Sequence, residues 1–247
     1  MSSVSIGPAT VAVALTTLWR APEAVRPIDA PAVDDKPDVT GWVAAMDHDA
    51  RLDLLQRVDS QAEAGEPVLV QELSGAWARV VLPWQPSRRD PDGYPGWIPL
   101  AHLRPAEPAD DELPSPRTTG DDVLATGQEL LGTEYVWGGL SGTGIDCSGF
   151  AHLSHRKHGL VIPRDASDQA RAGQPVPLDA LQPGDLIFFA FDNGAGAVHH
   201  VGFYAGEVNG TPTMLHAPRT GRRVEYFDLS DPSYATELCA ARRYLPA

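Results

Sequence analysis

The stretch Ile145-Asp146-Cys147-Ser148-Gly149-Phe150 marks the point where a glycine-rich loop gives way to a helix-like pattern. We expect Cys147 to open that helix. The N–H groups at a helix N-terminus are unsatisfied and together carry roughly +0.5 of an elementary charge, which stabilises a thiolate and lowers the cysteine pKa. The position therefore suits a nucleophile. The alternative is a structural cysteine beside a plain glycine turn.

Two histidines farther along the chain are candidate partners for this thiol. Alternation in the strand-like segment 199–204 places His200 and Gly202 on one side of the strand and His199 on the other. We expect the missing side chain of Gly202 to leave room beside His200 for the helix N-terminus. His216 ends the next strand. A cysteine nucleophile needs an imidazole base and a third polar group that fixes the tautomer of the base. The pattern predicts that Cys147, His200 and His216 form such a set.

The composition limits the class of protein. The 247 residues carry 19 basic and 33 acidic side chains and a net charge of −14, which disfavours nucleic acid and an anionic membrane surface as partners. No stretch reaches the roughly 18 apolar residues of a membrane-spanning helix. Cys147 and Cys239 lie far apart, which is consistent with a reducing compartment. We expect a cytoplasmic monomer without a cofactor, in which Cys239 packs as a small apolar side chain.

Three histidines follow Cys147 at every third position, His152, His155 and His158. Zinc-binding helices commonly pair histidines four residues apart beside a carboxylate. This run lacks that pattern. We therefore predict solvated histidines on a polar face of the helix, and no metal site.

The chain reads as two domains joined by a linker. Residues 1–104 contain short strand-like segments and a helical pattern around 42–58, in which Asp49 is the predicted N-cap of a second helix. Residues 105–117 are rich in proline and acidic side chains, which is typical of a linker. Residues 118–247 combine the Cys147 helix with strands predicted at 185–191, 200–208, 213–216, 224–229 and 238–245. A cysteine-bearing helix on an antiparallel sheet is an α+β, papain-like arrangement.

Six short motifs occur in order in the second domain: Tyr135-Val136-Trp137-Gly138-Gly139, Asp146-Cys147-Ser148-Gly149-Phe150, Pro163-Arg164-Asp165, Pro183-Gly184-Asp185-Leu186, His200-Val201-Gly202-Phe203-Tyr204 and Leu215-His216-Ala217. Together they resemble the NlpC/P60 family of papain-like cell-wall cysteine peptidases. The resemblance implies hydrolysis of the γ-D-glutamyl bond to a diamino acid, lysine or meso-diaminopimelate, in peptidoglycan stem peptides.

The same resemblance implies roles for single residues. Cys147 would be the nucleophile, His200 the general base and His216 the orienting residue. Tyr135 would reach the oxyanion or the substrate carbonyl. The remaining substrate-binding or oxyanion candidates are Asp146, Ser148, Arg164 and Asp165. Ala166 stands where the family commonly has serine, so one substrate hydrogen bond is lost or moved to Ser167. Alternatively, Arg164 forms a structural ion pair with Asp165 or Asp168.

The first domain ends in Gly96-Trp97-Ile98-Pro99 and resembles a bacterial SH3-like β-barrel. With segments 42–46, 57–61 and 93–97, it is similar to the SH3-like domain of cytoplasmic dipeptidyl-peptidases that process murein peptides with a free N-terminal L-Ala. That resemblance implies that Asp59 and Tyr94 bind the substrate's ammonium. The family usually has Glu in place of Asp59, so Glu66 is an alternative ligand. Otherwise Tyr94 only covers the barrel and Asp59 only caps a turn.

The sequence thus predicts an α+β protein with an SH3-like β-barrel and helical insertion in residues 1–104, a linker in 105–117 and a papain-like catalytic domain in 118–247. Its predicted function is to cleave L-Ala-γ-D-Glu from the diamino acid in murein peptide recycling. One alternative is a secreted hydrolase of intact peptidoglycan. Another is a non-catalytic wall-binding module, which the complete set of one cysteine and two histidines argues against.

Overall fold

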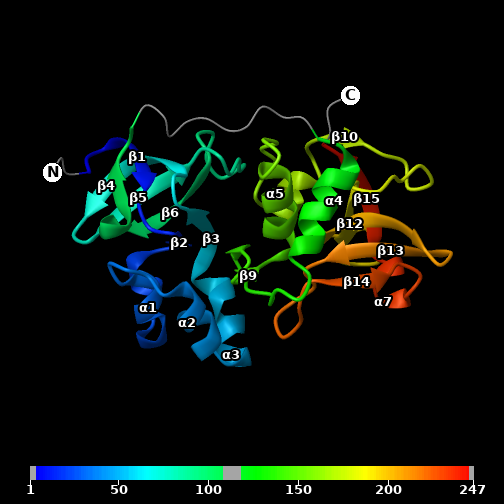
Figure 1. The fold of residues 1–247 in the computed structure, drawn as a ribbon, viewed down its shortest axis with the longest axis horizontal. Coiled ribbons are helices and arrows are strands. Elements are labelled where there is room, and N and C mark those ends of the chain that lie inside the picture. Colours follow the sequence, from blue (N-terminus) through cyan, green and yellow to red (C-terminus); the bar gives the residue numbers. More distant parts are fainter. Residues whose placement is uncertain (1–3, 108–117, 245–247) are drawn as a thin grey trace. The chain divides into compact units, whose positions relative to one another are not determined.

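The computed structural model describes residues 4–107 and 118–244 (Figure 1). The chain divides into two units. The N-terminal unit comprises Met1–Leu113 and Val136–Gly144, and the C-terminal unit comprises Pro114–Tyr135 and Ile145–Ala247. The predicted domain boundaries stay predictions, and residues 108–117 of the predicted linker lie outside the described residues. Among the helices that are described, none is long and apolar enough to cross a membrane.

The N-terminal unit is built on a seven-stranded sheet with the order β3-β2-β6-β5-β4-β1-β7 and antiparallel pairs. Its core is a cluster of buried aliphatic side chains and Tyr94. In the described part of the chain, β3 and β7 end the sheet, so an antiparallel β region is shown but a closed barrel is not. The strands are β1 (Gly7–Val11), β2 (Leu15–Trp19), β3 (Val58–Glu63), β4 (Pro67–Ser74), β5 (Trp77–Leu82), β6 (Tyr94–Pro99) and β7 (Leu103–Pro105).

A helical insertion joins β2 to β3. It comprises η1 (Pro22–Ala24), η2 (Pro27–Asp29), α1 (Ala30–Val33), α2 (Val39–Ala45), α3 (His48–Leu52) and η3 (Asp53–Gln56), while η4 (Leu100–His102) follows β6. Asp47 caps α3 by accepting the Ala50 N–H at 2.8 Å. The predicted N-cap, Asp49, is therefore wrong. The backbone is extended at Asp47, whereas Asp49 already lies inside the helix and cannot cap it.

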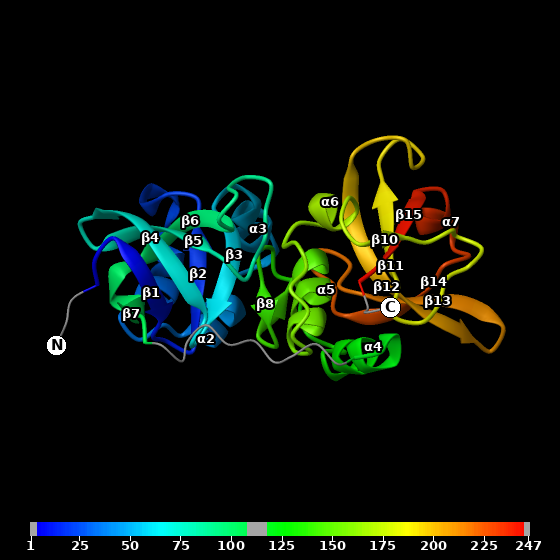
Figure 2. The ribbon, with the colours of Figure 1, turned by 90° about the horizontal axis from the view of Figure 1, so that it is seen from above.

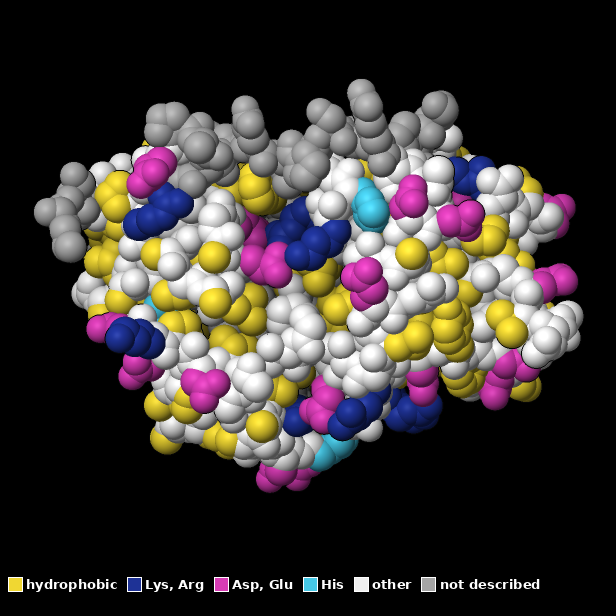
Figure 3. Space-filling model, in the orientation of Figure 1, with side chains coloured by type: hydrophobic (Ala, Val, Ile, Leu, Met, Phe, Trp, Pro, Cys, Tyr) yellow, Lys and Arg dark blue, Asp and Glu magenta, His cyan; other side chains and the backbone are white. Residues whose placement is uncertain are grey.

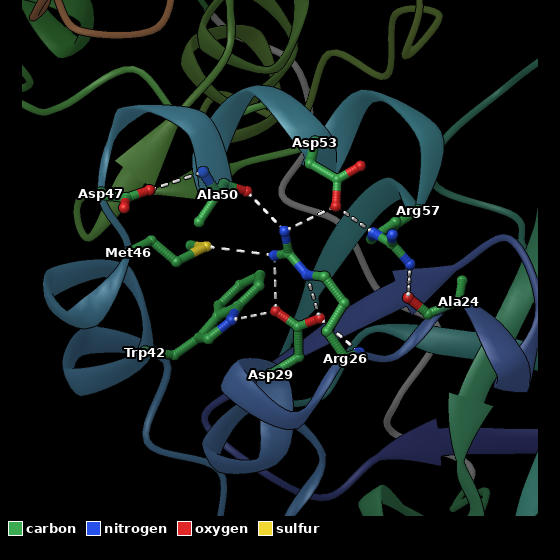
Figure 4. Close-up of polar contacts among 9 residues, drawn as sticks. All are labelled: Ala24, Arg26, Asp29, Trp42, Met46, Asp47, Ala50, Asp53 and Arg57. Carbon is green, nitrogen blue, oxygen red and sulfur yellow. Dashed lines mark hydrogen bonds and ion pairs between the residues drawn. The ribbon is translucent and has the colours of Figure 1, made fainter.

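Arg26 ties this insertion together (Figure 4). Its guanidinium donates to both carboxylate oxygens of Asp29 at 2.9 Å, to the Ala50 carbonyl at 2.9 Å and to Asp53 at 3.0 Å. Asp29 is fully buried and also accepts the Trp42 indole N–H at 2.8 Å. A buried charge is tolerated only when it is paired and hydrogen-bonded in this way. The network therefore holds the helices that precede β3.

The C-terminal unit is built on a six-stranded antiparallel sheet with the order β10-β15-β11-β12-β13-β14. The strands predicted from residue 185 onward are confirmed, the last of them as far as Arg243, while residue 245 lies outside the described residues. The elements are β10 (Gln174–Pro175), β11 (Leu186–Ala190), β12 (Val198–Val208), β13 (Thr211–His216), β14 (Glu225–Asp228), β15 (Leu238–Arg243), α4 (Gly120–Glu129), α5 (Cys147–Arg156), α6 (Ala166–Gln169) and α7 (Pro232–Ala235). Outside this sheet, in the stretch of chain between α4 and α5 that includes the N-terminal unit's segment Val136–Gly144, β8 (Leu140–Ser141) and β9 (Gly144–Ile145) form a short two-stranded sheet.

The two faces of this larger sheet carry different helices. Figures 1 and 2 show α5 and α7 on opposite sides of it. On the α5 side, Phe203 of β12 meets Phe150 edge to face, with ring centroids 5.4 Å apart. On the α7 side, Phe189 of β11 meets Tyr234 at 5.0 Å. The alternation predicted for residues 199–204 is therefore confirmed, because His200 packs with Phe189 and Tyr234 while Phe203 packs with α5.

The helix that begins at Cys147 is buried on all sides. All ten of its residues are buried, including His152 and His155, so the prediction of solvated histidines is wrong for these two. The reason is tertiary: α4, α6 and β12 all pack around α5. Each Nδ1 lies 2.8 Å from a backbone carbonyl, of Ile162 and Ala151 respectively. No group of side chains that suits a metal ion occurs in the described residues.

Charged side chains of both signs are interspersed on the face shown in Figure 3. Some charged side chains of the protein form partly exposed ion pairs, such as Arg223 with Glu134 at 2.8 Å in the C-terminal unit. Exposed pairs of this kind contribute little to stability, about 0–1 kcal/mol each. The excess of acidic side chains in the sequence therefore acts mainly on solubility.

Candidate active site

The nucleophile candidate opens α5, as predicted. Asp146 is the N-cap residue and accepts the Gly149 N–H at 2.6 Å. The same carboxylate receives two hydrogen bonds from Arg164, at 2.9 Å and 2.8 Å. Arg164 also donates to the Ser148 hydroxyl at 3.0 Å, and it is only 1% exposed. The residues on either side of Cys147 are therefore held by one buried guanidinium.

The thiol itself is neutral in this environment. Burial and the neighbouring charge of Asp146 raise the pKa of Cys147 to about 12. Hydrogen bonding from the backbone of Val201 and Ser148, and the charge of Arg164, act in the opposite direction. The expected lowering of the pKa by the helix N-terminus is therefore wrong for this protein, because desolvation and a like charge outweigh the partial charge of the helix. Attack by Cys147 then needs a base.

Two buried imidazoles lie next to each other on β12 and β13. His200 Nε2 and His216 Nδ1 are 2.8 Å apart and share one hydrogen bond. Burial, together with the other imidazole, holds the pKa of His200 well below its usual range. Burial and then the charge of Arg222 lower the pKa of His216 to about 3. Both rings are therefore neutral at pH 7. The Val201 backbone hydrogen-bonds the Cys147 sulfur, and Val201 follows His200 directly in β12.

Gly202 makes room for the second imidazole and not for the helix. A Cβ at Gly202 would lie 3.0 Å from the His216 Cβ and 3.3 Å from the Leu215 carbonyl. The prediction that Gly202 accommodates the helix N-terminus is therefore wrong. His200 and Gly202 share the sheet face opposite the body of α5, where the neighbouring strand β13 supplies His216.

Two tyrosines complete the surroundings of the thiol. Tyr135 is 7% exposed, and burial, followed by the neighbouring Cys147, raises its pKa well above the usual value. Its hydroxyl also hydrogen-bonds the cysteine. Tyr234 packs edge-on against His216 at 5.3 Å and at a tilt against His200 at 5.4 Å. Sequence reasoning missed Tyr234. Pro232 is a local signal for the start of the short helix α7. No local pattern, however, predicts that Tyr234 packs against the two imidazoles.

Asp165 directly precedes α6, at the N-cap position of that helix. It is half-buried, and its backbone carbonyl accepts the N–H groups of Asp168 at 3.0 Å and Gln169 at 2.9 Å. Ala166 is buried as the first residue of α6. Ser167 is half-buried. The substrate-binding role of Asp165 stays a prediction.

The residues predicted to bind the substrate's amine lie in the N-terminal unit. Asp59 of β3 pairs with Arg20 and Arg89, each at 3.0 Å. Tyr94 is 3% exposed and lies beneath the Arg89 guanidinium. Glu66 is 1% exposed, and its carboxylate accepts the Gln85 amide at 2.7 Å. Their roles toward substrate also stay predictions.

The segment Val136–Gly144, which separates Tyr135 from the Cys147 motif in the sequence, is anchored on β3 of the N-terminal unit. Trp137 donates its indole N–H to the Val58 carbonyl at 2.9 Å. The Leu140 N–H donates to the Gln61 side chain at 3.0 Å. Gly138 has φ +74°, and a Cβ there would lie 2.6 Å from Val58 Cγ1. Only glycine fits such a close approach in the left-handed region.

A buried cysteine that opens a helix, together with a hydrogen-bonded pair of imidazoles on neighbouring strands of the same unit, has the side chains that a cysteine nucleophile and its base require. The model of the NlpC/P60 family matches residues 132–243. The chain is 35% identical to the gamma-D-glutamyl-L-lysine dipeptidyl-peptidase of Bacillus subtilis (strain 168), over 95% of this chain and 98% of that protein. It is 33% identical to the protein of the same name from Bacillus cereus (strain ATCC 10987), over 96% and 91%.

A solved structure agrees over almost the whole chain. The crystal structure of an NlpC/P60 family protein from Bacillus cereus ATCC 10987 gives a TM-score of 0.88 at 33% identity, and the match covers 97% of this chain and 100% of that chain. This chain therefore belongs to the NlpC/P60 family and is a peptidase of that family.

Proposed function

We propose that this peptidase hydrolyses the γ-D-glutamyl bond to a diamino acid, lysine or meso-diaminopimelate, in peptidoglycan stem peptides that carry a free N-terminal L-Ala. The observation that carries the proposal is the likeness to a gamma-D-glutamyl-L-lysine dipeptidyl-peptidase over 95% of this chain, N-terminal unit included. The product would be the dipeptide L-Ala-γ-D-Glu. The proposed setting is murein peptide recycling in the cytoplasm, by a monomer whose N-terminal unit is an SH3-like barrel.

In the proposed mechanism, Cys147 Sγ attacks the carbonyl carbon of the γ-D-glutamyl group. His200 takes the thiol proton at Nδ1, and in this mechanism its Nε2–H is the donor in the 2.8 Å contact with His216 Nδ1. A neutral imidazole pair suits this step, since a proton-accepting ring must start unprotonated. His216 holds His200 in the tautomer that leaves Nδ1 free.

The negative charge then develops on the carbonyl oxygen. The Tyr135 hydroxyl and backbone N–H groups at the start of α5 would stabilise it, which is commonly one of the largest contributions to catalysis. The His200 imidazolium returns the proton to the departing amine of the diamino acid. Water, with His200 as base, hydrolyses the resulting thioester and frees the cysteine.

The substrate's free amine would be bound by Asp59 and Tyr94 of the N-terminal unit. A carboxylate and an ammonium make a charge-assisted hydrogen bond. A blocked L-Ala amine loses that bond, and a peptide whose L-Ala is still joined to glycan has no free N-terminal amine to offer. The proposed preference is therefore for small, released stem peptides.

Mass spectrometry of reaction products tests the proposal. Free L-Ala-γ-D-Glu-L-Lys, its meso-diaminopimelate counterpart and intact sacculi are incubated separately with the wild type and with Cys147→Ala. We expect L-Ala-γ-D-Glu from the free peptides with wild type only, and an unchanged circular dichroism spectrum for the variant. Activity of Cys147→Ala would reject the nucleophile. Efficient digestion of sacculi would favour a secreted wall hydrolase instead, and cell fractionation would separate the two locations.

A further inference from the structure

The carboxylate of Asp59 is shared by two arginines. Its Oδ1 lies 3.0 Å from Arg20 Nε, and its Oδ2 lies 3.0 Å from Arg89 Nη1. The Asp59 side chain is 4% exposed, while those of Arg20 and Arg89 are 40% and 45% exposed. Two cations therefore cover one buried anion. The cluster carries a formal net charge of about +1 at neutral pH, which is the wrong sign for attracting an ammonium.

Arg89 contacts Tyr94 as well. Its guanidinium carbon lies 5.0 Å from the centre of the Tyr94 ring, a cation–π contact. Burial lowers the pKa of Arg89, but the Asp59 carboxylate and Tyr94 outweigh it and raise that pKa above its ordinary value. Arg89 thus stays charged. A single guanidinium engages both side chains that the proposed function assigns to the substrate's amine.

We propose that Arg89 is a specificity-determining residue that competes with the substrate's ammonium for Asp59 and Tyr94. This inference rests on the proposed function, because it takes those two residues as the amine site. The Arg89 guanidinium and the substrate ammonium would bind the same carboxylate oxygen of Asp59. The substrate amine can therefore form its ion pair with Asp59 only when the ion pair between Arg89 and Asp59 breaks. An Asp59 carboxylate without Arg89 would bind the free amine more tightly. Arg89 therefore reduces the enzyme's preference for substrates with a free amine.

The surroundings of Arg89 allow this exchange. It lies in the connection between β5 and β6, residues 83–93, and nearly half of its side chain is exposed. A long, exposed arginine loses little by turning toward water. Arg20 remains on the other carboxylate oxygen when Arg89 leaves. Replacing Arg89 therefore does not strand an unpaired buried charge, which makes Arg89→Gln a suitable variant.

The test compares a free-amine stem tripeptide with its N-acetyl form. We measure kcat and KM of the full chain as wild type, Arg89→Gln, Asp59→Asn and Arg79→Gln. Arg79 is an exposed arginine in β5 outside the cluster, so Arg79→Gln makes the same charge change as a matched control. For Arg89→Gln we expect KM for the free amine to fall roughly threefold to fivefold, as for a partly exposed ion pair. We expect kcat, and both constants for the acetylated peptide, to stay the same.

The other results separate the two proposals. If Arg89→Gln leaves KM for the free amine unchanged or raises it, while Asp59→Asn abolishes the preference over the acetylated peptide, competition by Arg89 is wrong and the amine site stands. If Asp59→Asn leaves the preference intact, the amine site is wrong and the role of Arg89 with it. An equal fall in KM for Arg79→Gln would assign the effect to net charge and overturn a specific role for Arg89.

Discussion

Replacing Arg164 by methionine should destabilise the protein strongly, because it leaves the Asp146 carboxylate buried without its ion pair. Arg164 is 1% exposed and donates to both oxygens of Asp146, at 2.9 Å and 2.8 Å. Removing one partner of a buried pair costs about 3–5 kcal/mol in the free energy of unfolding. The Gly149 N–H still donates to Asp146 at 2.6 Å, so we expect the lower end of that range.

Urea unfolding at pH 7, followed by circular dichroism, measures this cost. Asp146→Asn removes the buried charge but keeps a side chain that caps helices well. The double variant with Arg164→Met should therefore be more stable than Arg164→Met alone. Arg171→Met is the matched control, since the Arg171 side chain is 61% exposed and lies 3.8 Å from Asp168. It should change the unfolding free energy by less than about 0.5 kcal/mol.

The same substitution, Arg164→Met, should also lower the reactivity of the Cys147 thiol. The charge of Arg164 lowers the pKa of Cys147, against burial and Asp146, which raise it. Loss of that charge leaves less thiolate, so iodoacetamide should alkylate Cys147 more slowly in Arg164→Met than in wild type. A loss of stability below about 1 kcal/mol, or a double variant no more stable than Arg164→Met, would refute the reasoning about an unpaired buried carboxylate.

Three further outcomes are expected. Gly202→Ala should lower kcat about tenfold, the effect of roughly 1.4 kcal/mol, because its Cβ would lie 3.0 Å from the His216 Cβ; steady-state kinetics measures this, and an unchanged kcat would contradict it. Trp137→Phe should lower the free energy of unfolding by about 1 kcal/mol, because the indole donates to the Val58 carbonyl at 2.9 Å; an unchanged urea midpoint would contradict it. Burial lowers the pKa of His155 from 6.5 to about 4, so its contribution to stability is present above pH 6.5 and is lost as the pH falls toward 4. The loss amounts to about 3 kcal/mol, and His155→Gln should flatten that part of a plot of unfolding free energy against pH.

Local pattern was enough to place the elements that carry the candidate site. The change from a glycine-rich loop to a helical pattern marks a helix start, and Cys147 does open α5. Alternation along β12 separates His200 from Phe203, because successive side chains of a strand point to opposite faces. These features depend on residues that are neighbours in the chain.

Other predictions failed where distant residues decide the outcome. The spacing of His152 and His155 indicates a polar face, but α4, α6 and β12 bury it. The space at Gly202 is filled by His216 from the next strand. The helix N-terminus was expected to lower the pKa of Cys147, yet burial and Asp146 raise it to about 12.

The sequence by itself determined the chemistry of this protein: a cysteine at a helix start, two histidines on neighbouring strands, and the motifs of a peptidase family. Only the tertiary structure decided how charged those groups are and what surrounds them. It made the thiol and both imidazoles neutral through burial, and it set Arg20 and Arg89 on Asp59. The physical reason is that desolvation and ion pairing depend on distances between side chains far apart in the chain, which local patterns do not encode.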